Sequence, residues 1–208
     1  MPLTLQALIA ALPDAITSAV FLCIWISPFA FGTSAVKAAM LTMLVEFFLV
    51  HATGFYTGFG VGLDWTRRNP WIGIAGLTSF YVVMIGAFAW AFEAWWMLLA
   101  FGWLFVGKLH WLLKKPSDDQ TTQAMAAWAG MVVVYLFACF FTILVDQPYL
   151  GIRPELVATF GLDPKSEGVW ESEPHRVVAF GTLYFGIFAL AKFFGPFIAV
   201  AWRRRRLA

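Results

Sequence analysis

The stretch that decides the fold runs from Lys37 to Leu63 and reads KAAMLTMLVEFFLVHATGFYTGFGVGL. About 20 apolar residues in an α-helix cross the roughly 30 Å hydrocarbon core of a bilayer, and this run is long enough to do so. Its interior carries Glu46 and His51. An ionised carboxylate inside a bilayer is unfavourable without a partner or water, so such residues usually face the interior of a helix bundle. The stretch therefore predicts a transmembrane helix with a polar centre.

The whole composition is that of an integral membrane protein. Of the 208 residues, 61% are hydrophobic and 12% are charged, whereas soluble domains are about 45–50% apolar and about 25% charged. The formal net charge is +2, and the basic residues stand in short clusters beside apolar runs. That arrangement argues against nucleic-acid binding. Both cysteines, Cys23 and Cys139, fall inside expected spans, where apolar burial is the ordinary state of a free thiol.

Apolar runs of membrane-spanning length recur along the chain and predict six transmembrane helices. Before the first span, apolar residues recur at the i, i+3, i+4 and i+7 spacing of an amphipathic helix, which we expect to lie at the membrane surface and to end at Pro13. These residues are Leu5, Leu8, Ile9 and Leu12. The predicted fold is an all-α membrane protein, a polytopic bundle of six transmembrane helices with a short N-terminal interfacial helix, in one domain over residues 1–208.

The third and fourth spans are expected to form a hairpin. The apolar run from Trp71 to Leu113 is about twice the thickness of one membrane, so it has to reverse. The segment Trp90–Trp96, WAFEAWW, is the best place for the reversal, because Glu93 interrupts the hydrophobicity and tryptophans prefer the membrane interface. At the end of the first span, Pro28 is expected to bend or terminate the helix.

One long segment, Asp146–Arg176, is predicted to lie outside the membrane as an ordered loop. It carries six acidic and three basic residues. Within it, Pro154 followed by apolar residues and then Gly161 predicts a short helix, with proline in the first turn and glycine after the last. Its last residues, ESEPHR at 171–176, are expected to form a solvated or salt-bridged cap on the last span, the alternative being a site for an anion or a cation.

The charge distribution predicts the orientation. With six spans, the basic pairs at 67–68 and 114–115 and the arginines at 203–206 fall on one side of the membrane, and the acidic loop falls on the other. The positive-inside rule then places both termini in the cytoplasm, in a multi-pass protein of the cell membrane, the inner membrane in a bacterium.

Glu46 belongs to a predicted polar stripe. Thr42, Thr53 and Thr57 lie four, seven and eleven residues away, which returns them to nearly the same side of the helix. One interpretation is a site for a solute, an ion or a proton. The other is a protonated glutamic acid hydrogen-bonded between helices.

His51 lies on a different side of this helix, about 140° from Glu46, so the two do not form one metal site. It shares a face with Gly54, Gly58 and Gly62, whose spacing favours close packing of another helix. His51 is then either a hydrogen-bond partner between helices or a functional residue.

Lys192 lies inside the last span. Counted from the outer ends of the two helices, it is close enough in depth to pair with Glu46. The alternative is that its amine extends to the cytoplasmic headgroups.

No cofactor or metal is expected. The three histidines fall at three different depths, which argues against a bis-histidine haem or a zinc site. The chain also has no HExxH, CxxC, GxSxG or P-loop motif.

The leading hypothesis is a small non-enzymatic membrane protein that handles an ion or solute, or a subunit of a membrane assembly. The candidate binding residues are Glu46, His51, Thr53, Thr57 and Lys192. The alternative is an intramembrane enzyme acting on a lipid or lipid-linked substrate, with Glu46 and His51 in one cavity and the outer loop as a lid. The expected partners are membrane lipids and either another membrane protein or further copies of the chain.

Overall fold

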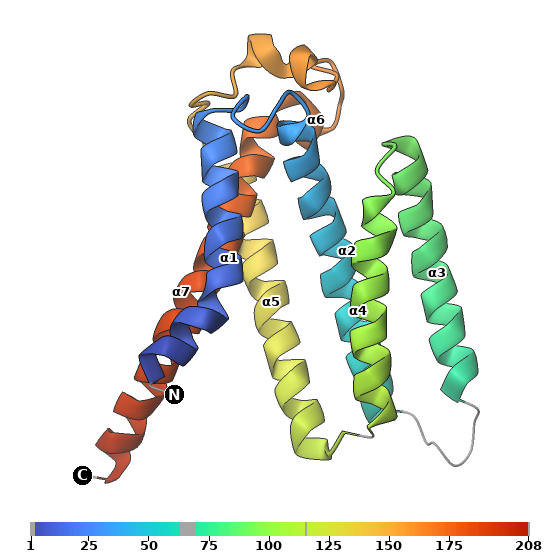
Figure 1. Cartoon of the computed structure of the whole chain (residues 1–208), viewed down its shortest axis with the longest axis vertical. Helices are drawn as coiled ribbons and strands as arrows, with labels where there is room; N and C mark the ends of the chain where they lie inside the picture. Colours follow the sequence, from blue (N-terminus) through green and yellow to red (C-terminus); the bar gives the residue numbers. More distant parts are fainter. Residues whose placement is uncertain (1–2, 63–69, 115, 208) are drawn as a thin grey trace. The chain divides into compact units, whose positions relative to one another are not determined.

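The computed structural model describes the backbone of residues 3–62, 70–114 and 116–207, and the side chains of these residues except 3, 59–62, 70 and 197–207. Every regular element in these ranges is helical, and six helices are long and apolar enough to cross a membrane. The all-α fold with six such helices is therefore confirmed (Figure 1). In chain order the elements are α1 (Leu3–Ile26), α2 (Ala35–Gly62), α3 (Pro70–Ala91), α4 (Trp96–Leu113), α5 (Asp118–Leu144), η1 (Pro154–Phe160), α6 (Val169–Ser172) and α7 (Pro174–Leu207).

The chain packs into two compact units. The first unit combines Met1–Leu41 with Val134–Ala208, and the second comprises Thr42–Val133. The expectation of one domain over the whole chain stays a prediction.

The core of the first unit is the contact between α1 and α7, which lie side by side (Figure 1). The ring of Phe21 lies directly on Gly181, where an added Cβ would overlap its ring carbons. One residue further along α7, the carbonyl of Thr182 accepts a hydrogen bond of 2.8 Å from the Ser18 hydroxyl. Small residues at such positions let membrane helices approach closely, and polar contacts of this kind add to their association.

A separate N-terminal surface helix is not supported. Instead, α1 is one continuous helix that includes Pro13. Proline inside a helix removes one backbone hydrogen bond and commonly bends it, and α1 bends in its N-terminal part (Figure 1). The predicted apolar face is exposed, whereas Ala7 and Ala11 are buried. A helix boundary was predicted at Pro13 because the i, i+3, i+4 and i+7 spacing of apolar residues is ambiguous. It occurs in a helix on the membrane surface and also on the lipid-facing side of a long transmembrane helix.

The predicted reversals are confirmed. α1 ends at Ile26, two residues before Pro28. α3 ends at Ala91 and α4 begins at Trp96, so the chain turns within the segment expected from the sequence. Glu93 adopts a left-handed conformation with φ of 56°, which closes this turn without a glycine or a proline.

The outer loop is attached to the end of α1. The indole of Trp25 donates a hydrogen bond to the carbonyl of Pro148 (2.9 Å), and the amide of Gly151 donates one to the carbonyl of Trp25 (2.9 Å). The predicted short helix is present as the 3-10 helix η1, and Gly161 ends it in the left-handed conformation at φ 71°. A glycine adopts this conformation without steric cost, which explains its position after the last turn.

The second unit is built around the α3–α4 hairpin and the adjoining part of α2 (Figure 1). Tyr56 of α2 and Thr78 of α3 share a hydrogen bond of 2.7 Å between their hydroxyl oxygens. The rings of Tyr81 and Phe101 pack with centroids 5.7 Å apart across the hairpin. Tyr56, Tyr81 and Phe101 are all at most 2% exposed, so large aromatic side chains form much of this core.

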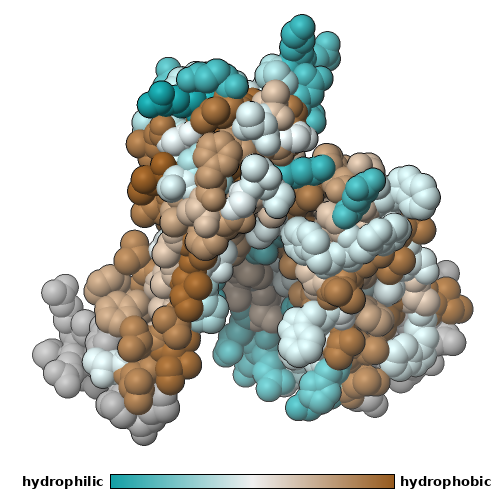
Figure 2. Space-filling view, turned by 45° about the horizontal axis from the view of Figure 1, so that its top comes forward, coloured by the Kyte–Doolittle hydropathy of each residue, from teal (hydrophilic) through white to brown (hydrophobic). Residues whose placement is uncertain are grey.

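The outer surface of the helices is largely apolar, as expected for a protein surrounded by lipid. Large apolar side chains such as Leu99 and Trp103 are 76% and 84% exposed. In Figure 2, residues of hydrophobic or intermediate hydropathy cover most of the visible sides of the helices, and hydrophilic residues gather in a few patches.

Several residues used to predict the orientation lie outside the described part of the chain. Leu63, Arg67, Arg68 and Lys115 are among them, and the arginines at 203–206 are described only as part of the backbone of α7.

Replacement of Gly181 by alanine is expected to lower the free energy of unfolding by about 1–3 kcal/mol, because the new Cβ has to displace the Phe21 ring in a close-packed contact. Thermal unfolding in detergent measures the effect. Gly195→Ala on the same helix is the control, because nothing lies within 4 Å of a Cβ added there. Equal stability of the two variants would contradict the predicted tight contact.

Candidate functional site

Two threonines of the predicted polar stripe are buried in the second unit. Thr53 is 8% exposed and Thr57 is 0% exposed. The Thr57 hydroxyl donates a hydrogen bond to the backbone carbonyl of Thr53 at 2.7 Å. This bond uses the hydroxyl proton and leaves the oxygen able to accept. Thr42 and Glu46, nearer the start of α2, are half-buried.

The Thr57 oxygen accepts a hydrogen bond from Lys108, which the sequence analysis did not select. Lys108 Nζ lies 3.2 Å from Thr57 Oγ1 and 5.7 Å from the centre of the Trp111 ring. An ammonium group at this distance from an indole face gains a cation–π attraction. Lys108 is five residues before the end of α4 at Leu113, so it lies about 7.5 Å inside the helix end.

Lys108 has no carboxylate partner within the ranges that the structure describes. Its ammonium group has three N–H donors, and one of them is used by Thr57. The free-energy penalty for a lysine in a transmembrane helix is about 2.5–3.5 kcal/mol at the helix centre and smaller toward the ends, and an ionisable residue within a span usually marks a functional site. A lysine without an acidic neighbour is therefore the strongest candidate for a binding group.

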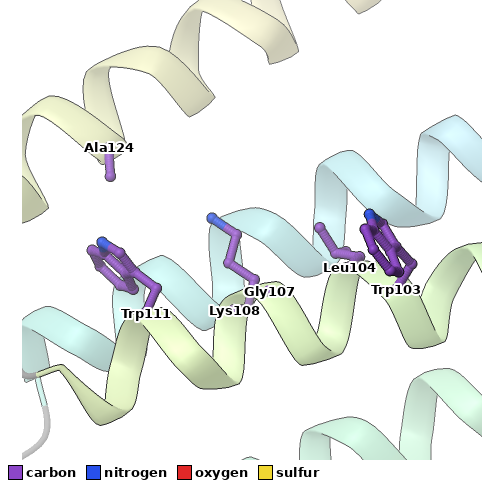
Figure 3. Close-up of a pocket in the computed structure, with 6 residues that line it drawn as sticks. All are labelled: Trp103, Leu104, Gly107, Lys108, Trp111 and Ala124. Carbon is purple, nitrogen blue, oxygen red and sulfur yellow. The ribbon is translucent and has the colours of Figure 1, made fainter.

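Lys108 lines an open pocket of about 340 Å³ between α4 and α5. The residues that line this pocket, which we call the Lys108 pocket, are Trp103, Leu104, Gly107, Lys108, Trp111 and Ala124. Figure 3 shows the nitrogen atoms of Trp103, Lys108 and Trp111 on the side of α4 that faces Ala124 of α5. Neither indole N–H donates a hydrogen bond within the described part of the chain.

The Lys108 pocket is chemically suited to an anion. Its lining supplies one ammonium group and two indole N–H groups and includes no acidic residue. Hydrogen bonds from a charged donor to an anionic oxygen are roughly twice as strong as those between neutral groups. The remaining lining is apolar, and ligand sites commonly combine an apolar lining with a few polar groups in this way.

The sequence does contain a signal for this site. In α4, Lys108 is the one lysine, and no arginine, aspartate or glutamate accompanies it. Leu104 and Trp111 lie four residues before and three residues after it, which places both on its helix face. In the sequence, Lys108 resembles an ordinary lysine at the membrane interface because the basic pair at 114–115 follows it closely. The hydrogen bond to Thr57, which only the structure shows, distinguishes it from such a lysine.

The structure places His51 away from this pocket. His51 is exposed, and its ring packs against that of Phe47 with centroids 4.4 Å apart. Neither His51 nor Glu46 lines the Lys108 pocket.

The predicted glycine face meets a side chain at Gly54. An added Cβ there would overlap the indole of Trp128, whose N–H donates a hydrogen bond of 2.9 Å to the carbonyl of Val50. At Gly58 nothing lies within 4 Å of an added Cβ, and the surroundings of Gly62 fall outside the described side chains. The close approach of another helix backbone along these glycines stays a prediction.

Lys192 pairs with a residue that the sequence analysis did not consider. Its Nζ lies 2.5 Å from Oδ2 of Asp14, across the contact between α7 and α1. The Lys192 side chain is 46% exposed and that of Asp14 is 16% exposed. This ion pair connects the two central helices of the first unit.

The salt-bridged cap predicted at the start of the last span is confirmed. Arg176 pairs with Glu173 and, at 3.1 Å, with Asp146. Its guanidinium group also donates hydrogen bonds to the carbonyls of Thr142 and Ile143 at 3.1 and 3.0 Å. These carbonyls belong to the last turn of α5, where backbone acceptors lack partners within the helix. Arg176 is thus a structural residue whose bonding groups are occupied.

No group of three or more histidine, cysteine, aspartate or glutamate residues that could hold a metal occurs within the described ranges.

Comparison of the chain with models of protein families, with curated proteins and with solved structures gave no match. Function is accordingly argued from the geometry of the site.

The two cations are expected to respond differently to substitution. Arg176→Met should lower the free energy of unfolding by about 1–3 kcal/mol, because it leaves carbonyls and carboxylates without their charged donor. Lys108→Met should leave stability unchanged or raise it, because no carboxylate in the described ranges loses a partner. Thermal unfolding of both variants in the same detergent is the measurement. An equal loss in the two would assign Lys108 a structural role.

Proposed function

We propose that the chain is a multi-pass protein of the cell membrane that handles a small anionic solute, with Lys108 as the group that binds the anion. The observation that carries this proposal is the Lys108 ammonium group, which lies within a helix able to span the membrane and faces a pocket without an acidic residue. Both termini lie in the cytoplasm according to the positive-inside rule, so the Lys108 end of α4 is the cytoplasmic end.

The energetics favour an anionic ligand over a structural role for this lysine. A charged group placed in a membrane span without a counter-charge carries a free-energy penalty, and a bound anion would offset it. Thr57 and the Trp111 ring fix the amine in position before the ligand arrives. Preorganised donors bind a ligand more strongly because less side-chain entropy is lost on binding.

The polar stripe of α2 belongs to the same proposal. Thr57 contacts Lys108 directly, and Glu46 lies eleven residues earlier, about 16 Å along the helix. We propose that Glu46 is the second polar group of the solute path. The role of an assembly subunit and the enzymatic alternative with Glu46 and His51 stay predictions.

Lys108→Met is expected to abolish the stabilisation of the protein by small anions. A ligand that binds only the folded state stabilises it by RT ln(1 + [L]/Kd), so the unfolding temperature rises with the ligand concentration. Inorganic phosphate and glycerol 3-phosphate are the probes, and the unfolding temperature in a neutral detergent is the readout. Lys114→Met is the matched control, since Lys114 is exposed at the end of the same helix and lies outside the pocket. The same anion-induced shift in Lys108→Met as in the wild-type chain would refute the proposal.

Glu46→Gln is expected to change the flux of the anion or its coupling to protons while leaving the protein folded. The substitution keeps the shape of the side chain and removes its ability to ionise, so it tests charge without creating a cavity. Flux into reconstituted vesicles with an imposed pH gradient is the measurement. Flux equal to that of the wild-type chain at every pH would count against a role for Glu46 in the path.

A further inference from the structure

The Lys108 pocket follows the axis of α4 (Figure 3), and its two ends differ chemically. Trp103 lies ten residues before the end of α4, about 15 Å inside it, near the middle of a bilayer. Trp111 lies two residues before the end, at the depth of the lipid headgroups. Lys108 lies between them, closer to Trp111. The deep end of the pocket is therefore lined by the Trp103 ring and Leu104, and the end near the membrane surface carries the positive charge of Lys108.

The side chains around the pocket are exposed on the outside of the second unit. Trp103 is 84% exposed, and Val106, which precedes Gly107 of the pocket, is 62% exposed. At the end of the helix, Leu113 is 56% exposed. In a membrane, apolar side chains with this exposure face lipid. Within the second unit, no layer of protein then separates the exposed Trp103 side of the pocket from the bilayer.

Gly107 leaves the space that such a ligand would occupy. Nothing lies within 4 Å of a Cβ added at Gly107, although the residue lines the pocket between Leu104 and Lys108. On the opposite wall, α5 contributes Ala124, another small side chain. Both positions keep the middle of the pocket open from its deep end to the ammonium group.

We infer that the anion held at Lys108 is the phosphate group of a membrane lipid in the cytoplasmic leaflet. The phosphate accepts hydrogen bonds from Lys108 and from the Trp111 indole N–H, and an acyl chain packs against Trp103 and Leu104. This inference rests on the proposed anion site and names its ligand class. A free phosphate ester offers the same anionic oxygens, but it would leave the deep end of the pocket empty.

The experiment compares the binding of phosphatidic acid with that of glycerol 3-phosphate, which is the same headgroup without the acyl chains. Purified protein is titrated with dioleoyl phosphatidic acid, dioleoyl phosphatidylcholine and glycerol 3-phosphate, and bound ligand is counted by native mass spectrometry. Phosphatidic acid is expected to bind at least about tenfold more tightly than glycerol 3-phosphate, because burial of two or more methylene groups already accounts for such a factor. Lys108→Met is expected to weaken phosphatidic acid binding about tenfold through loss of a charged hydrogen bond, and Lys114→Met is expected to leave it unchanged.

A second pair of variants tests the path of the acyl chain. Gly107→Leu places a side chain in the pocket and is expected to weaken phosphatidic acid binding about tenfold, since it excludes a similar volume of lipid. Gly102→Leu is the control on the same helix, because Gly102 also has nothing within 4 Å of an added Cβ but does not line the pocket. Should Gly107→Leu fail to fold, Ala124→Leu narrows the pocket from the α5 side.

The outcomes separate this inference from the proposed function. Glycerol 3-phosphate binding that depends on Lys108 and is as tight as that of phosphatidic acid would overturn the lipid inference and leave the anion site intact. Equal retention of phosphatidic acid by Gly107→Leu and Gly102→Leu would also overturn the lipid inference. Binding of both phosphate ligands that is unaffected by Lys108→Met would overturn the anion site and the lipid inference together.

Discussion

Inside a bilayer there is no water to bond to a polar group, so each donor and acceptor of this chain has to find a partner within the protein. The backbone meets this requirement by forming helices. Hydroxyl side chains meet it by bonding to the carbonyl one turn earlier, as Thr57 does to Thr53 and Thr182 does to Val178. Charged side chains have no such local solution, and their contacts therefore distinguish structural groups from binding groups.

Three cations of the helices show this difference. Arg176 donates to two carbonyls and pairs with two carboxylates, and Lys192 pairs with the carboxylate of Asp14. Lys108 bonds to a neutral hydroxyl and lies over an indole ring, and it faces a pocket that contributes further N–H donors. The first two residues hold helices together. The third carries the positive charge that a ligand can neutralise.

Patterns among neighbouring residues in the sequence were enough to predict much of the fold, but little of the site around Lys108. Pro28, the tryptophan-rich turn around Glu93 and the segment from Pro154 to Gly161 all act through neighbours in sequence, and the structure has the expected turns and helix there. The continuous α1 was missed because its apolar spacing fits a surface helix as well as a long helix, and because α1 packs against α7, which is far away in the sequence. Lys108 and Asp14 were missed because their roles depend on partners 51 and 178 residues away along the chain.

The bonds from Arg176 to the end of α5 bear on the order of assembly during synthesis. The carbonyls of Thr142 and Ile143 leave the ribosome more than thirty residues before the guanidinium group that satisfies them. Until α7 emerges, the outer end of the fifth helix has to rest in the wet interfacial layer, where water bonds to these carbonyls. The end of the fifth helix therefore exchanges water for the Arg176 guanidinium group only when the last helix arrives, and a chain truncated before Arg176 leaves these two carbonyls to water.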